Sequence, residues 1–246
     1  MPEATTGSFQ DFRKTAPGSR FTDWLASRAE PYWTQATDHA FTRAIGDGSM
    51  PEEAYVRYLI EDYTFITDLA STLGYLVAKA PSMQSKGKLS GFLALLTSEE
   101  NDYFIRSFEA LGVDPDTYES ATQGPVTRAF SELLLTSSGQ GTYAEGLACL
   151  LCAEWCYLTW GQREASKPRP DHFYLAEWID LHALPGFEDF VNWIRQEMDQ
   201  VGAALPPKDQ ERLADIFRQM SVLEFQFFEA AWTGTPPDLS SANQRI

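Results

Sequence analysis

Three acidic side chains occupy positions that the surrounding pattern assigns to apolar helix faces. Asp62 lies three residues before Phe65, on the same face. Glu154 interrupts the most apolar stretch of the chain, residues 147–160, and Glu224 adjoins a run rich in phenylalanine. Burying a carboxylate costs several kcal/mol unless it is paired or hydrogen-bonded. One such acid could be partly exposed or ion-paired, but three on three helices favour a shared pocket.

Three cysteines form a second candidate site. Cys149, Cys152 and Cys156 recur at intervals of three and four residues and therefore share one face of a predicted helix. A metal or cluster site would need more ligands, and the chain has no fourth cysteine and only three histidines. Free cysteine is among the most buried residue types. We therefore interpret the three cysteines as core residues and expect no metal site.

The motifs of several other enzyme classes are missing from the sequence. There is no Walker-type loop, no glycine-rich dinucleotide motif after a strand, and no Glu-x-x-His pair for a di-iron centre. Glu177 and His182 are five residues apart, which does not place them on one helix face. We therefore expect no cofactor.

Helical periodicity extends over most of the chain and must position these residues. Apolar residues recur at three- and four-residue spacing from Phe21 onward, and glycines and prolines end each segment. No alternating pattern predicts a sheet, and no linker is long enough to separate two domains. We predict a flexible leader over residues 1–20, one all-α domain over residues 21–233 and a loose tail over residues 234–246. Eight to ten helices should form an irregular bundle.

Composition limits the partners and the compartment. The 246 residues carry a formal net charge of −16, which opposes binding to nucleic acid or anionic lipid. No apolar run reaches the ~18 residues of a membrane span, and residues 1–15 lack the apolar core of a secretory signal. An odd number of cysteines does not suit a disulfide framework. We expect a cytoplasmic protein with reduced thiols that contacts neither nucleic acid nor membrane.

The chain resembles the TenA (thiaminase II) family over about residues 21–233. The order and spacing of four short motifs carry the resemblance. They are Gly46-Asp47-Gly48-Ser49-Met50-Pro51, Tyr58-Leu59-Ile60-Glu61-Asp62, Cys152-Ala153-Glu154-Trp155-Cys156-Tyr157 with Gly161, and Leu223-Glu224-Phe225-Gln226-Phe227-Phe228.

The resemblance implies a haem-oxygenase-like helical fold and the hydrolysis of aminopyrimidines for thiamin salvage. By motif match, it implies that Asp62 binds the amino and ring nitrogens of the pyrimidine and that Glu224 is the catalytic glutamate. Tyr157 matches a tyrosine on the central helix, and His182 falls where many members carry a pocket tyrosine. Family members are often homo-oligomers, so we expect a dimer or tetramer.

The departures from the family pattern narrow the expected activity. The usual active-site cysteine aligns with Ala153, and an acid, Glu154, stands beside it. Phe65 occupies a position where a tyrosine is common in the family. Phe130 aligns with another such position. This pattern resembles the branch of the family that lacks the cysteine and uses a glutamate. The resemblance therefore implies hydrolysis of an aminomethyl or formylaminomethyl pyrimidine by carboxylate chemistry.

A carboxylate pocket suits such a substrate. A 4-aminopyrimidine presents an amidine-like edge, which one carboxylate can bind through two charge-assisted hydrogen bonds. Without a thiolate a water must attack, and it needs a general base whose pKa an apolar pocket has raised. Glu154 and Glu224 are the candidates for base and acid, in either order, while Asp62 orients the ring.

Two alternative functions remain open at this level. A haem-oxygenase-like fold could bind a redox cofactor, and His39 is the only candidate for an axial haem ligand on an early helix. The same pocket could also hold a planar ligand without catalysing a reaction.

Overall fold

Helices begin and end at the caps and glycines that the sequence supplies. Thr142 starts one helix through reciprocal hydrogen bonds with Glu145, and Gly48 and Gly234 end two others with φ values of 74° and 69°. The computed structural model describes residues 2–235. In this part of the chain the α-helices (α) and π-helices (η) are α1 (Phe9–Thr15), α2 (Phe21–Arg28), α3 (Tyr32–Thr37), α4 (Ala40–Asp47), α5 (Glu52–Lys79), α6 (Met83–Leu95), η1 (Leu96–Glu100), α7 (Asn101–Ala110), α8 (Pro115–Glu119), α9 (Pro125–Leu135), η2 (Thr136–Gln140), α10 (Tyr143–Ala165), α11 (Phe173–Leu181), α12 (Pro185–Ala203) and α13 (Pro207–Thr233).

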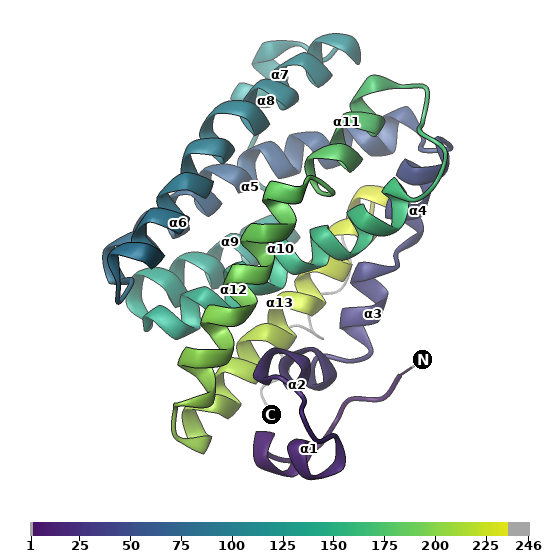
Figure 1. Cartoon of the computed structure of the whole chain (residues 1–246). Helices are drawn as coiled ribbons and strands as arrows, with labels where there is room; N and C mark the ends of the chain where they lie inside the picture. The colour runs from purple at the N-terminus through teal and green to yellow at the C-terminus, as the bar shows by residue number, and fades with distance from the viewer. Residues whose placement is uncertain (1, 236–246) are drawn as a thin grey trace.

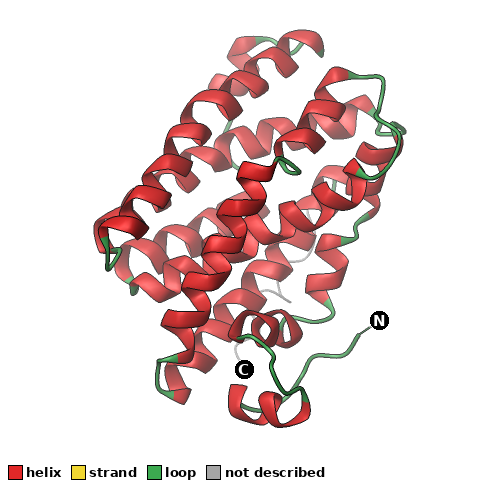
Figure 2. Cartoon of the chain, viewed as in Figure 1, coloured by secondary structure: helices red, strands yellow, loops and turns green. Residues whose placement is uncertain are grey.

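The two central helices, α10 and α13, pack along each other in the middle of the bundle (Figure 1). Helix α12 packs on α10, α3 packs on α13, and α5 packs on both α6 and α9. Across residues 2–235 the helices are joined by loops without any strand, as Figure 2 shows. The predicted all-α irregular bundle is therefore confirmed. None of the helices described is both long and apolar enough to cross a membrane.

The N-terminal segment is more ordered than the expected flexible leader. Residues 9–15 form α1, whose first turn is capped by the Ser8 side chain. The Phe9 ring is buried and lies 5.1 Å from the ring of Phe21 and 5.9 Å from that of Trp24. This apolar contact holds α1 against α2. Of the expected tail, residues 236–246 lie outside the described part of the chain.

The helices described are more numerous than the eight to ten expected. Two short helices, α3 and α4, follow each other within residues 32–47, because the His39 side chain caps the start of α4. The π-helix η1 separates α6 from α7. Such wide turns shift the register of the side chains that follow them and have no simple sequence signature.

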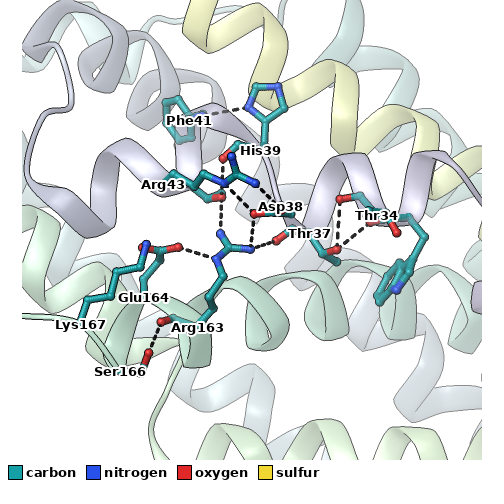
Figure 3. Close-up of polar contacts among 12 residues, drawn as sticks. Thr34, Thr37, Asp38, His39, Phe41, Arg43, Arg163, Glu164, Ser166 and Lys167 are labelled. Atoms are coloured by element: carbon teal, nitrogen blue, oxygen red, sulfur yellow. Dashed lines mark hydrogen bonds and ion pairs between the residues drawn. The ribbon is translucent and has the colours of Figure 1, made fainter. Parts of the chain in front are cut away.

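A buried ion-pair network fixes the C-terminal end of α10 against α3 and α4 (Figure 3). Glu164 has no exposed side-chain surface, and its carboxylate oxygens accept bonds of 2.6 Å from both Arg163 and Lys167. Arg163 also donates to the Thr37 carbonyl and forms an ion pair of 3.1 Å with Asp38. The buried charge is therefore compensated on both sides.

Gly46 on α4 packs directly against the Glu164 side chain of this network. A Cβ at Gly46 would lie 1.7 Å from Oε2 of Glu164. Since Glu164 is held by two cations, its carboxylate cannot turn aside without loss of an ion pair. The glycine therefore allows the close approach of α4 and α10.

We expect Gly46→Ala to lower the free energy of unfolding by about 1–3 kcal/mol, because the added methyl group overpacks the buried network. The matched control is Gly74→Ala on α5, where a Cβ meets nothing within 4 Å and alanine should stabilise the helix by up to ~1 kcal/mol. Urea unfolding of both variants gives the comparison. Equal stability of the two variants would contradict this packing role.

Candidate active site

A small cavity in the interior, which we call the chamber, lies among α5, α6, η1, α10 and α11. Its volume is about 30 Å³, about that of one water molecule. Its wall combines apolar residues with six side chains that carry polar atoms. These six are Asp62, Glu100, Glu154, Tyr157, Trp178 and His182. Neither lysine nor arginine is among the residues that line it.

Helical spacing brings Asp62 and Phe65 to the chamber from α5. They lie on the same face as Ile66 and Leu69, which also line the chamber. Asp62 is only 4% exposed. Burial raises the pKa of this carboxyl to about 7, and a hydrogen bond from Tyr58 opposes the rise. Asp62 is therefore poised to change its charge near neutral pH.

Glu154 reaches the chamber from α10, together with Ala153 and Tyr157. This helix is apolar over most of its circumference, so a glutamate in its interior cannot avoid burial, and Glu154 is 6% exposed. Burial raises its pKa to about 8, and the nearby charge of Asp62 adds to the rise. The two acids thus face one cavity without a basic partner on its wall.

Glu224 on α13 is close to these acids but does not line the chamber. It is 1% exposed, and within residues 2–235 neither of its carboxyl oxygens has a hydrogen-bond partner. Burial raises its pKa well above the usual range, and the charges of Asp62 and Glu154 raise it further. Such an unsatisfied buried group is costly and is typical of a functional position.

A chain of hydrogen bonds supports Asp62 from behind. The Tyr58 hydroxyl accepts from Nε1 of Trp178 at 3.0 Å and lies 2.9 Å from the Tyr157 hydroxyl. Either hydroxyl of the Tyr58–Tyr157 pair can donate to the other, and a hydrogen bond from Tyr58 acts to lower the pKa of Asp62. The chain therefore directs a hydrogen bond onto the Asp62 carboxylate.

His182 contributes a neutral imidazole to the wall. Its Nδ1 lies 2.8 Å from the Trp178 carbonyl, which only accepts, so Nδ1 carries the hydrogen. Burial lowers the pKa of His182 to about 4, and its ring lies 4.8 Å from that of Tyr157. At neutral pH Nε2 is therefore a hydrogen-bond acceptor.

The sequence-predicted residues do not all line the cavity. Phe65 does, whereas Phe130 lies behind it with the two ring centroids 4.6 Å apart. Phe130 supports the wall and has no surface on the chamber. Sequence reasoning also missed Glu100, the last residue of η1, which lines the chamber and is half-buried. No sequence signal marks Glu100, because its orientation depends on the π-helical turn.

The cysteines lie in the core, as expected, and are unpaired. The Cys152 thiol lies 3.3 Å from the Ser221 hydroxyl, and burial raises its pKa well above the usual range. A protonated, enclosed thiol is a poor nucleophile. The neighbouring residue on the chamber wall is Ala153. Across the described residues, no group of three or more potential ligands could hold a metal ion.

His39 is engaged at both ring nitrogens. Nδ1 accepts from the Phe41 backbone amide at 3.0 Å, so Nε2 carries the hydrogen and donates to Glu229 at 3.0 Å. Axial ligation of haem would require one of these nitrogens. The arrangement does not support the cofactor alternative.

The chain is similar to known proteins over most of its length. A model of the TENA/THI-4/PQQC family matches residues 26–234. An aminopyrimidine aminohydrolase of Halalkalibacterium halodurans is 26% identical over 85% of this chain and 93% of that protein. An aminopyrimidine aminohydrolase of Helicobacter pylori is 23% identical over 85% of this chain and 97% of that protein. The structure of a TenA family transcription regulator from Silicibacter sp. TM1040 has a TM-score of 0.79 at 22% identity, covering 89% of this chain and 99% of that chain, and shows a haem-oxygenase-like fold for this chain.

The raised pKa values predict that stability falls with increasing pH. Asp62 and Glu154 keep their protons in the folded protein up to about pH 7 and 8, whereas the unfolded chain releases them near pH 4. Folding therefore takes up protons between these pH values. Once the pH exceeds the folded and the unfolded pKa of a group, each unit of difference between them lowers the free energy of unfolding by ~1.4 kcal/mol.

We expect the melting temperature of the wild type to fall between pH 5 and pH 8, and Glu154→Gln to fall less steeply because one of these protons is no longer released. The control is Glu188→Gln, an exposed acid on α12, which should keep the wild-type slope. A Glu154→Gln variant with that same slope would show that Glu154 is already ionised in the folded protein.

Proposed function

Because the chain belongs to the TENA/THI-4/PQQC family, we propose that it hydrolyses aminopyrimidines in thiamin salvage. The observation that carries the proposal is that two buried acids, Asp62 and Glu154, face one chamber without a lysine or arginine on its wall. Relatives named aminopyrimidine aminohydrolase support the same activity. The proposal keeps the expectations of a cytoplasmic homo-oligomer with one catalytic domain over residues 21–233.

Asp62 is proposed to bind the amidine-like edge of the pyrimidine. Its two oxygens can accept from the exocyclic amino group and from a protonated ring nitrogen, which is a charge-assisted bidentate contact. With a pKa of about 7, Asp62 can pass its own proton to the ring nitrogen as the pair forms. The aromatic rings of Phe65, Tyr157 and Trp178 supply a wall for the flat heterocycle.

Glu154 is proposed as the general base, because it is the glutamate on α10 that faces the chamber. In its ionised form, which becomes populated as the pH approaches its pKa of about 8, it takes a proton from water as the water oxygen bonds to the methylene carbon of an aminomethyl substrate. The carbon–nitrogen bond breaks and its electrons leave with the nitrogen. A substrate in the ammonium form releases ammonia directly, whereas a neutral amine takes the required proton from a general acid; the hydroxymethyl product remains. Positioned proton transfer of this kind contributes typically ~10²–10⁴-fold. No thiolate is required, consistent with Ala153 on the wall.

Glu224 is proposed as the general acid. Burial raises the pKa of Glu224 well above its usual range, which favours the protonated form that a proton donor to a departing nitrogen needs. Burial raises the pKa of Tyr157, and the charges of Asp62 and Glu224 raise it further. Tyr157 lines the chamber on the same helix as Glu154 and is proposed as a further catalytic residue.

The chamber has room for about one water molecule, so a pyrimidine can enter only if side chains at its boundary move. Side-chain rotamer changes are common on binding, whereas the backbone moves little in most complexes. Substrate binding should therefore be accompanied by rearrangement of the aromatic wall and not of the bundle.

Two variants separate binding from chemistry. We expect Asp62→Asn to weaken binding of hydroxymethylpyrimidine by about 10–100-fold, because a charge-assisted hydrogen bond is lost. Glu224→Gln should bind this product with nearly wild-type affinity and lose at least about 100-fold in kcat on the aminomethyl substrate. Calorimetry and ammonia release measure the two effects.

The control is Asp68→Asn, which changes a half-buried acid on α5 that does not line the chamber and should leave both quantities unchanged. Full turnover by Glu224→Gln would refute its catalytic assignment. Product binding by a wild type that releases no ammonia from a panel of pyrimidines would instead favour the non-catalytic alternative.

A further inference from the structure

A larger cavity, which we call the vestibule, adjoins the chamber. Its volume is about 540 Å³, and it lies among α6, η1 and the start of α12. Phe92, Glu100 and His182 line both the vestibule and the chamber. These three residues therefore form the boundary between the two spaces, and the vestibule is the approach to the buried acids.

The vestibule wall is open because glycines line it. An added Cβ at Gly87, Gly91 or Gly186 would meet nothing within 4 Å. The vestibule has ample room for a substituted pyrimidine, whereas the chamber does not. A substrate that reaches Asp62 must therefore pass Glu100.

Glu100 is an acid without a counter-charge at this boundary. It forms no hydrogen bond or ion pair with the other described residues, and the acids whose charges act on it are Glu154 and Asp62. Burial raises its pKa, and both of these charges raise it further. The basic residue of the vestibule, Lys88, is exposed and does not line the chamber. An organic cation at the boundary would relieve this repulsion.

The two candidate substrates, an aminomethyl pyrimidine and a formylaminomethyl pyrimidine, differ in the charge of the group that would meet Glu100. A primary aminomethyl group is protonated at neutral pH, as a lysine amine is, whereas a formylamino group is neutral. Resting on the proposed function, we propose that Glu100 is a specificity-determining residue that binds the ammonium group of aminomethyl pyrimidines and so selects them over neutral analogues. The preferred substrate class is thus a cationic aminomethyl heterocycle.

The neighbouring glutamate supplies a matched control. Glu99 has the same side chain on the same π-helix, is exposed, and lines the vestibule but not the chamber. Removal of the Glu99 charge tests whether any acid near the entrance is enough to select the cationic substrate.

The test compares the aminomethyl pyrimidine with its N-formyl derivative in the wild type, Glu100→Gln and Glu99→Gln. We expect Glu100→Gln to raise KM for the cationic substrate by about 10-fold or more and KM for the formyl substrate by less than about 3-fold. Glu99→Gln should change both values by less than about 2-fold. An equal loss on both substrates, or no loss on either, would overturn the proposal.

The failure of the proposed function would be visible separately. If the wild type converts neither compound, that function is wrong. Calorimetric binding of the aminomethyl and hydroxymethyl pyrimidines to the wild type and Glu100→Gln then reads the charge preference without turnover. A preference for the ammonium compound that disappears in Glu100→Gln supports the role of Glu100, and identical preferences in the two proteins contradict it.

Discussion

The burial of several carboxyl groups without a basic partner is the constraint on which the site depends. The same chain shows how a buried acid is ordinarily stabilised, since Glu164 is enclosed by bonds from Arg163 and Lys167. Glu224 is equally buried, yet its oxygens find no partner within residues 2–235. Folding therefore tolerates an electrostatic cost at the chamber that it avoids about three helical turns further along α10. A cost confined to one place is typical of a binding or catalytic site.

The buried acids also differ in pKa, and this difference suits them to different roles. The charge of Asp62 raises the pKa of Glu154, and the charges of Asp62 and Glu154 both raise the pKa of Glu224. Asp62 receives the Tyr58 hydrogen bond and has the lower value, about 7, whereas Glu154 has a value of about 8. The acid that ionises first suits recognition of a heterocycle that carries a proton, and those that ionise later suit proton transfer. A cationic substrate supplies the positive charge that neither a lysine nor an arginine provides on the chamber wall.

Much of this arrangement could be predicted from the sequence, because it depends on local spacing. Asp62 was found from its place on an apolar face, and Glu154 from its interruption of an apolar helix. Glu100 could not be found, since a π-helical turn after a regular helical pattern decides which way it points. Phe130 was placed in the site although it lies behind Phe65, because helix spacing does not tell how deep a ring packs. The order of α1 likewise depends on a distant contact.

The protonation state of these acids is the most direct test of this account. Infrared absorption of protonated carboxyl groups can be followed during a pH titration of the wild type, Asp62→Asn and Glu154→Gln, without any substrate. We predict a protonated-carboxyl band that persists at pH 7, loses the contributions of Asp62 and Glu154 as the pH passes 8, and is weaker in each variant. A band that is lost near pH 4 in all three proteins would show that the acids are solvated and would contradict the account.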